Sequence, residues 1–210
     1  MNGAEVDTHS TPFFDSLFAN QPVMAILRGL PPDQTVDLCR RAWDIGVDVV
    51  EVPVQSPDAL PSLHAALAAG RERGRPVGAG TVVTPEQARS VHEAGAAFTV
   101  APGYDPQVAA ECAALGLPHL PGVATSSEIN QALRTGHTWL KAFPAAQLGA
   151  GWIRAQLAPF PTVRFVATGG VDADNAADFL SAGCRVVAVG SALQDPRQLD
   201  LLARLTGRLE

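Results

Sequence analysis

Short apolar runs alternate with helical segments along almost the whole of this 210-residue chain. The pattern predicts eight buried strands, at residues 23–28, 47–54, 76–81, 97–101, 118–123, 138–143, 163–168 and 185–190. Glycines that can end a helix in the left-handed conformation precede many of these runs, at positions 46, 95, 116, 136 and 183. Strands that alternate with helices predict a parallel sheet joined by helical crossovers.

Eight strand–helix units predict a closed (β/α)8 TIM barrel, and we expect residues 12–210 to form this single domain. A short helix at 12–19 should cover one end of it, and the polar residues 1–11 predict a flexible tail. The alternative is an open doubly wound sheet, but no G-x-G-x-x-G motif follows the first strand. The other helices are expected from Pro31 to Gly46 and at 57–72, 85–94, 106–115, 126–135, 149–159, 173–182 and 195–208.

One strand carries an unusual residue. Lys and Arg total 15, and because Lys141 is the only lysine, the other 14 are arginines. Arginine stays charged, whereas a buried lysine can lose its proton. A neutral amine in an apolar pocket is the nucleophile that forms a Schiff base with a carbonyl substrate. The alternative is a lysine that extends to solvent or pairs with a core carboxylate.

A carboxylate stands in a comparable place on the second strand. Side chains alternate along a strand, so Lys141 shares a face with Trp139 and Phe143, and Glu51 shares one with Val49. If both faces point into the barrel, Glu51 and Lys141 approach each other from opposite sides. A buried glutamate is unfavourable unless it is paired or used. Glu51 is therefore a candidate general acid/base, and a structural ion pair with Lys141 or Arg28 is the alternative.

Two glycine-containing loops follow the last two strands. Gly169 and Gly170 follow the seventh, and Gly190 and Ser191 follow the eighth. TIM barrels often bind phosphate in these loops, at a helix N-terminus. Glycine lets backbone N–H groups approach an oxyanion. We therefore expect the active site at the C-terminal ends of the strands, with a phosphate in these loops.

Composition and residue spacing argue against several classes of partner and cofactor. The net charge of −6 and the lack of a basic cluster argue against nucleic acid. No apolar run approaches 18 residues, so no membrane span or export signal is expected. The five histidines lack metal-ligand spacing, and no metal or other cofactor is expected. The odd number of well-separated cysteines indicates reduced, buried thiols in a cytosolic protein: Cys39, Cys112 and Cys184.

Five segments together resemble the KDPG/KHG aldolase family, the class I aldolases that cleave 2-keto-3-deoxy-6-phospho sugar acids to pyruvate and glyceraldehyde 3-phosphate. They occur in order over nearly the whole chain, from about residue 20 to 208. The segments are 25–29 (AILRG), 50–57 (VEVPVQSP), 78–82 (GAGTV), 140–144 (LKAFP) and 168–171 (TGGV).

The resemblance implies that Lys141 forms the Schiff base, that Glu51 moves protons and that Thr81 binds the pyruvate carboxylate. It further implies a homotrimer. The resemblance also implies residues that bind the rest of the phosphorylated substrate: Arg28, Gly170, Gly190 and Ser191, to which we add Gly169 of the same glycine loop. The residues that it implies to shape the pocket are Phe143, Pro102 and Thr125.

One position departs from the phosphogluconate-type pattern. Gln55 stands where that type has an arginine, and Gln55-Ser56-Pro57 is closer to the phosphogalactonate type. The sequence therefore leaves the sugar epimer open. Two further hypotheses also stay open: an aldolase for an unphosphorylated keto acid such as 4-hydroxy-2-oxoglutarate, and a non-catalytic barrel that binds a sugar phosphate.

Overall fold

The structure is a computed structural model that describes residues 6–207. Within these residues every paired strand is parallel to its neighbours, as predicted. The strands are β1 (Val23–Ile26), β2 (Val49–Pro53), β3 (Val77–Gly80), β4 (Thr99–Val100), β5 (His119–Leu120), β6 (Gly122–Val123), β7 (Trp139–Ala142), β8 (Arg164–Thr168) and β9 (Val186–Val189).

The sheet closes into a barrel through one interrupted strand. The strand order is β5-β4-β3-β2-β1-β9-β8-β7-β6, and only Pro121 separates β5 from β6. β5 pairs with β4 while β6 pairs with β7, so residues 119–123 bridge the two edges. A proline has no N–H to donate, which explains the break in this run. The predicted eight-unit TIM barrel is confirmed, with its fifth strand split in two.

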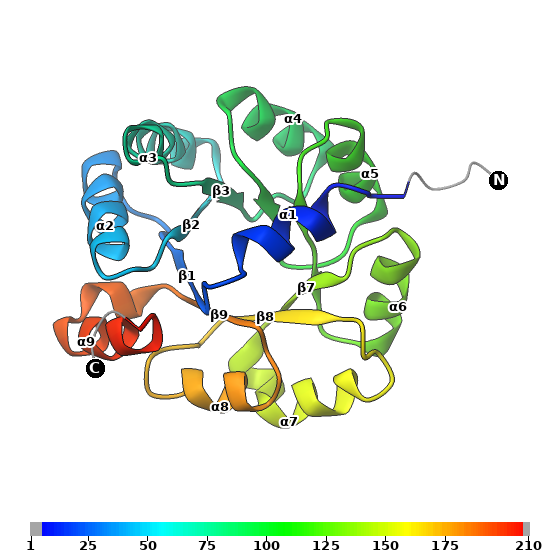
Figure 1. Ribbon diagram of the computed structural model, residues 1–210. Helices are drawn as coiled ribbons and strands as arrows, with labels where there is room; N and C mark the ends of the chain where they lie inside the picture. Colours follow the sequence, from blue (N-terminus) through cyan, green and yellow to red (C-terminus); the bar gives the residue numbers. More distant parts are fainter. Residues whose placement is uncertain (1–5, 208–210) are drawn as a thin grey trace.

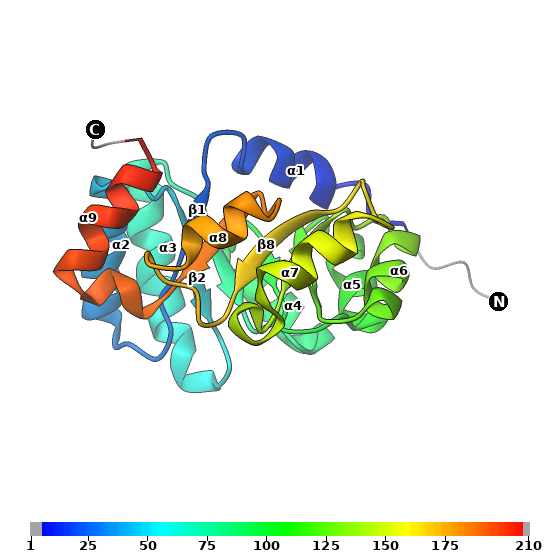
Figure 2. The ribbon, with the colours of Figure 1, turned by 90° about the horizontal axis from the view of Figure 1, so that it is seen from below.

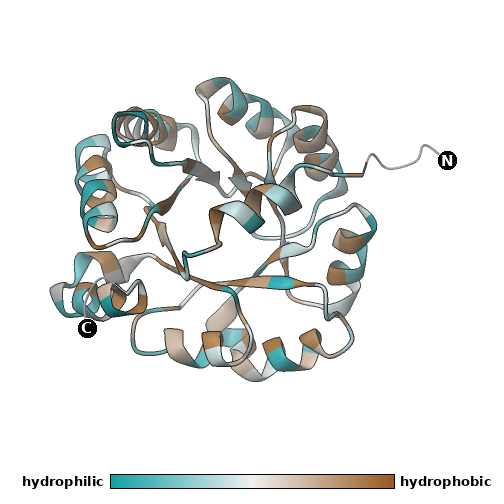
Figure 3. Ribbon diagram, viewed as in Figure 1, coloured by the Kyte–Doolittle hydropathy of each residue, from teal (hydrophilic) through white to brown (hydrophobic). Residues whose placement is uncertain are grey.

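Helices surround the barrel and alternate with the strands (Figure 1). Their hydrophilic and hydrophobic positions are mixed, whereas most strand positions are hydrophobic (Figure 3). The helices are α1 (Ser10–Leu17), α2 (Pro32–Asp44), α3 (Leu60–Arg73), α4 (Pro85–Ala94), α5 (Pro106–Ala114), α6 (Ser126–Arg134), α7 (Ala145–Leu157), α8 (Ala176–Ser181) and α9 (Pro196–Leu205), with 3-10 turns η1 (Pro57–Ala59) and η2 (Ser191–Gln194).

Several helix bounds differ from the prediction, and for two helices the structure shows why. α7 begins at Ala145 instead of 149, and Gly149 interrupts its helical backbone at φ 77°. The expected start thus coincides with the break inside the helix. α8 starts at Ala176 instead of 173, because Asp172 accepts hydrogen bonds from the backbone of Asp174 and Asn175 and forms a turn there.

A hydrophobic cluster fills the barrel interior below its C-terminal mouth. It combines residues of α1 with alternate residues of the strands, as the period of two requires. A second, larger cluster lies between the barrel and the helices. The inner cluster consists of Phe14, Phe18, Met24, Val49, Phe98, Val100, Leu120, Trp139, Val166, Val186 and Ala188.

The N-terminal segment differs from the expected flexible tail at residues 1–11. Residues 1–5 lie outside the described residues, but Asp7 and Ser10 are buried, and α1 begins at Ser10. The side chain of Asp7 pairs with His137, and its N–H donates to Thr135. α1 then crosses the N-terminal end of the barrel (Figures 1 and 2). Polarity alone suggested a loose tail, because the buried partners of these polar groups lie far along the chain.

Candidate active site

The side chains of Lys141 and Glu51 both point into the barrel interior. Their side chains are 2% and 0% exposed, and each lies two residues after an inner-cluster member, Trp139 and Val49. When the split strand β5–β6 is counted as one, three strands separate β2 from β7 in either direction around the barrel. The two strands therefore stand on opposite sides of it. The predicted alternation of side chains therefore brings the amine and the carboxyl group toward each other across the interior.

Burial dominates the electrostatics of this pair. It lowers the pKa of Lys141 from its ordinary value, and the nearby Arg28 lowers it too, although attraction to Glu51 opposes both effects. Burial likewise raises the pKa of Glu51 against the attraction of Lys141 and Arg28. No nitrogen–oxygen distance of 4.0 Å or less joins Lys141 and Glu51 in the described part of the chain. The arrangement thus favours a neutral amine opposite a protonatable carboxyl group.

Glu51 has unused hydrogen-bonding capacity. Both carboxylate oxygens are buried, and neither has a partner among residues 6–207. Buried polar groups without partners are uncommon in native proteins and are frequent at functional sites. The absence of a close partner argues against the structural ion pair considered for this residue.

Gly80 provides the space that Glu51 occupies. A Cβ atom built on Gly80 would lie 1.7 Å from Oε1 of Glu51. Gly78, also on β3, similarly makes room for the ring of Phe98, at 2.3 Å. The two glycines of this strand therefore admit a carboxyl group at the mouth and an aromatic ring below it.

With Glu51 as the general acid/base that the sequence predicts, Gly80→Ala is expected to displace its carboxyl group and to lower kcat for keto acid cleavage on the order of 10²-fold, since misplacement of a catalytic group by about 1 Å has this effect. Steady-state kinetics and a melting curve test this. Gly151→Ala is the matched control, because no atom lies within 4 Å of a Cβ there, and it should retain full activity. An unchanged kcat for Gly80→Ala would contradict the placement of Glu51.

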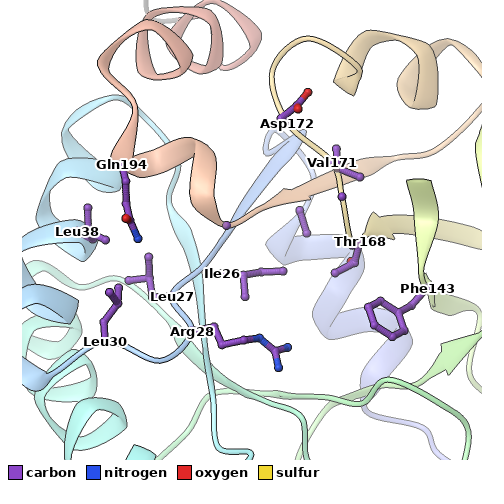
Figure 4. A pocket seen from close by; sticks show the side chains of 14 residues that line it. Ile26, Leu27, Arg28, Leu30, Leu38, Phe143, Thr168, Val171, Asp172 and Gln194 are labelled. Carbon is purple, nitrogen blue, oxygen red and sulfur yellow. The ribbon is translucent and has the colours of Figure 1, made fainter. Parts of the chain in front are cut away.

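A pocket of about 500 Å³ opens at the C-terminal ends of β1, β8 and β9 (Figure 4). Arg28 is its one cationic lining residue in the described structure. Lys141 does not line it, but its Nζ lies 4.9 Å from the ring centroid of Phe143, which does. The predicted residues on this lining are Arg28, Phe143, Gly169, Gly170 and Gly190.

The two loop glycines after β8 adopt positive φ angles, 95° at Gly169 and 71° at Gly170. A Cβ on Gly169 would lie 2.9 Å from the ring of Phe143, and one on Gly170 would lie 2.6 Å from Cβ of Ala146. Both positions therefore require glycine for conformation and for space. The side chain of Ser191, predicted to act with them, lies outside the described residues, although its backbone begins η2 beside Gly190.

The remaining predicted residues are placed less uniformly. Thr81 has a left-handed backbone, φ 59°, and accepts a hydrogen bond from Arg28 at 3.4 Å. Such a conformation is strained for threonine and often marks a functional position. The backbone of Pro102 contacts Gly122, which pairs with Lys141 in the sheet. The hydroxyl of Thr125 instead caps α6, and this residue does not line the pocket.

Thr168 is a site residue that the sequence did not single out. It is 3% exposed, its Oγ1 has no hydrogen-bond partner in the described structure, and it lines the pocket. Figure 4 shows it between Ile26 and Phe143. Its position as the last residue of β8, on the inner face, was the available signal. A free buried hydroxyl there can donate to, or accept from, a bound substrate.

Other kinds of site are not evident in residues 6–207. No group of three or more His, Cys, Asp or Glu side chains there could hold a metal ion. Nor does any helix in this part of the chain combine the length and the apolar character needed to cross a bilayer.

Known proteins resemble the chain over most of its length. The family described as KDPG and KHG aldolase matches residues 14–203. A 2-dehydro-3-deoxy-6-phosphogalactonate aldolase of Escherichia coli K12 is 35% identical, over 82% of this chain and 84% of that protein. A 2-dehydro-3-deoxy-phosphogluconate aldolase of Treponema pallidum is 40% identical, over 79% and 78%.

A solved structure is similar too. The KDPG aldolase from Legionella pneumophila, with pyruvate captured as a covalent carbinolamine intermediate, superimposes with a TM-score of 0.79 and 29% identity. The match covers 91% of this chain and 95% of that one.

Proposed function

This chain belongs to the KDPG and KHG aldolase family, and from that premise we propose that it is a class I aldolase that cleaves a 2-keto-3-deoxy-6-phospho sugar acid to pyruvate and glyceraldehyde 3-phosphate. The observation that carries this proposal is the buried pair at the barrel mouth. A lysine whose pKa burial lowers faces a glutamate whose pKa burial raises, from opposite walls of the barrel.

In the proposed reaction the neutral amine of Lys141 attacks the C2 carbonyl of the keto acid, and loss of water gives an iminium ion. Glu51, through a water molecule, removes the proton of the C4 hydroxyl group. The C3–C4 bond breaks, its electrons pass to the iminium ion, and the aldehyde leaves. Protonation of the resulting enamine and hydrolysis release pyruvate and restore the amine.

The substrate-binding roles rest on the geometry of the pocket. Arg28 contacts Thr81, and we propose that these residues bind the anionic keto acid portion of the substrate. The pocket of about 500 Å³ is large enough for a six-carbon phosphate ester. Its loops at Gly169, Gly170 and Gly190 are proposed to hold the phosphate through backbone N–H groups.

Side-by-side cleavage assays with the gluconate and galactonate 6-phosphates and with 4-hydroxy-2-oxoglutarate test this function. We expect kcat/KM for a phosphorylated substrate to exceed that for the unphosphorylated one by about 10²-fold or more, since a hydrogen-bonded, charge-assisted site discriminates strongly. Pyruvate formation is the readout. A higher kcat/KM for 4-hydroxy-2-oxoglutarate would assign the unphosphorylated substrate, and equal values would show that the phosphate is not recognised. Binding without cleavage of any of them would indicate a non-catalytic barrel.

The epimer preference depends on the loop after β2. Gln55 lies there and lines a neighbouring cavity of about 420 Å³ beside the pocket. A neutral amide supplies no positive charge where the phosphogluconate-type pattern has arginine. We propose that Gln55 helps to set this preference, which the two sugar phosphates in the same assays measure.

The cellular setting is also a proposal. We infer a homotrimer from family membership and a cytoplasmic location from three buried, unbridged cysteines. Burial raises the pKa of Cys39 to about 12, so this thiol stays protonated and unreactive at neutral pH.

A further inference from the structure

The N-terminal segment contacts three successive residues at the start of the strand that carries Lys141: the two residues before β7 and its first residue. Its contacting side chains are spaced four residues apart, with Asp7 before α1 and Thr11 and Asp15 on one face of it. Their partners are the three residues from two to four positions before Lys141. The pairs are Asp7 Oδ2 with His137 Nε2 (3.0 Å), Thr11 Oγ1 with Thr138 Oγ1 (2.8 Å), and Asp15 Oδ1 with Trp139 Nε1 (2.8 Å).

The apolar face of α1 enters the barrel beneath the amine. The ring centroids of Phe14 and Phe18 lie 6.5 Å and 5.1 Å from that of Trp139. Phe14 is also 5.8 Å from the ring of Phe98 and is fully buried. Because Trp139 is the inner-facing residue before Lys141 on β7, these rings form the layer next to the amine, on the side away from the mouth.

We propose that residues 7–18 are a positioning element for Lys141, which fixes the strand that carries the amine and excludes water from it at the N-terminal end of the barrel. The element does not touch substrate and acts only through β7. This inference rests on the proposed function, because it takes Lys141 as the Schiff-base residue.

In this proposal α1 lowers the pKa of Lys141 by excluding water and not through charge. The charged groups that act on Lys141 are Glu51 and Arg28, both on the mouth side. The titratable groups around α1 have partners of their own or are neutral: Asp7 pairs with His137, Asp15 pairs with Arg164, and burial lowers the pKa of His119 to about 3. What α1 presents toward the amine is therefore an aromatic surface, which acts by removing water.

The pH dependence of adduct formation with pyruvate, trapped by borohydride and measured by mass spectrometry, tests this inference. Phe14→Ser places a hydroxyl group in the aromatic layer and should admit water. The pKa of Lys141 should then rise, so the midpoint of trapping should move up by about one pH unit and the rate at pH 7 should fall about tenfold. Phe14→Leu keeps the layer apolar and should restore the wild-type midpoint.

Phe165→Ala is the matched control. Phe165 is also a fully buried phenylalanine, but it packs on the outer side of the barrel wall, 5.5 Å from Trp152 between ring centroids. The Phe165→Ala variant should lose about as much stability as Phe14→Ser, but the pH midpoint of pyruvate trapping should not shift. If Phe14→Ser does not fold, the double variant Thr11→Val/Asp15→Ala loosens α1 at partly exposed positions and should give a smaller shift in the same direction.

The outcomes separate the two proposals. No adduct in the wild-type protein at any pH would defeat the proposed function and, with it, this inference. An adduct in the wild-type protein with an unchanged midpoint in Phe14→Ser and in the double variant would overturn the inference alone. A shift of equal size in Phe165→Ala would also overturn it, because general loosening would then suffice.

Discussion

Lys141→Arg is expected to abolish cleavage, with kcat reduced by at least about 10⁴-fold, as is typical when a covalent nucleophile is lost. Arginine cannot become neutral at working pH, so it cannot form the imine. Borohydride with pyruvate should add one pyruvate-derived mass to the wild-type chain at Lys141 and none to the variant. Cleavage by Lys141→Arg at the wild-type rate would refute the Schiff-base mechanism.

Stability must be separated from chemistry in this experiment, because Lys141 is only 2% exposed. Lys141→Met removes the buried amine while keeping a similar shape, and it should be at least as stable as the wild type and equally inactive. A further control exploits the single lysine. Arg134→Lys in the Lys141→Met background leaves one lysine on the exposed face of α6, and this side chain should form no adduct.

Glu51→Gln is expected to lower kcat for C–C cleavage by about 10²- to 10⁴-fold, the usual contribution of a general acid/base. Imine formation should survive at a reduced rate, with a displaced pH midpoint. The attraction of Glu51 raises the pKa of Lys141, so its removal should lower that pKa further and move the midpoint of pyruvate trapping to lower pH. Trapping and single-turnover cleavage, measured on the same variant, separate the two effects.

The matched control for this prediction is Glu86→Gln. Glu86 is an exposed residue of α4 that pairs with Arg89, and its neutralisation should leave both trapping and cleavage unchanged. If Glu51→Gln kept kcat within tenfold of the wild type, another group would have to move the C4 hydroxyl proton. Thr168, the unpartnered hydroxyl on β8, would then be the next candidate to test.

The features that local pattern controls were predictable. The period of two along residues 47–54 and 138–143 put Glu51 and Lys141 on inner faces, and the structure places both in the barrel. The helix-ending glycines marked the strand–helix units that form the barrel. Burial and strand alternation arise from short-range order, so residues close in the chain carry the information.

Contacts between distant segments were not predictable in the same way. Gly80 reads as an ordinary strand glycine until the carboxyl group of Glu51 is found in the space of its missing side chain. Residues 7–11 read as a polar tail because the partner of Asp7, His137, lies 130 positions away. Thr125 was expected at the pocket, but the helix that it caps uses its hydroxyl group.

The amino-acid order of this chain was sufficient to indicate its parallel barrel, its single lysine on an inner face and the carboxyl group opposite, since each depends on periodicity and residue chemistry. Folding in three dimensions was needed to establish the depth of Lys141, the space at Gly80 that the Glu51 carboxyl group fills and the attachment of α1 beneath the candidate active site. The reason is that desolvation and steric fit depend on all the neighbours of an atom, and most neighbours of these groups come from other strands and helices.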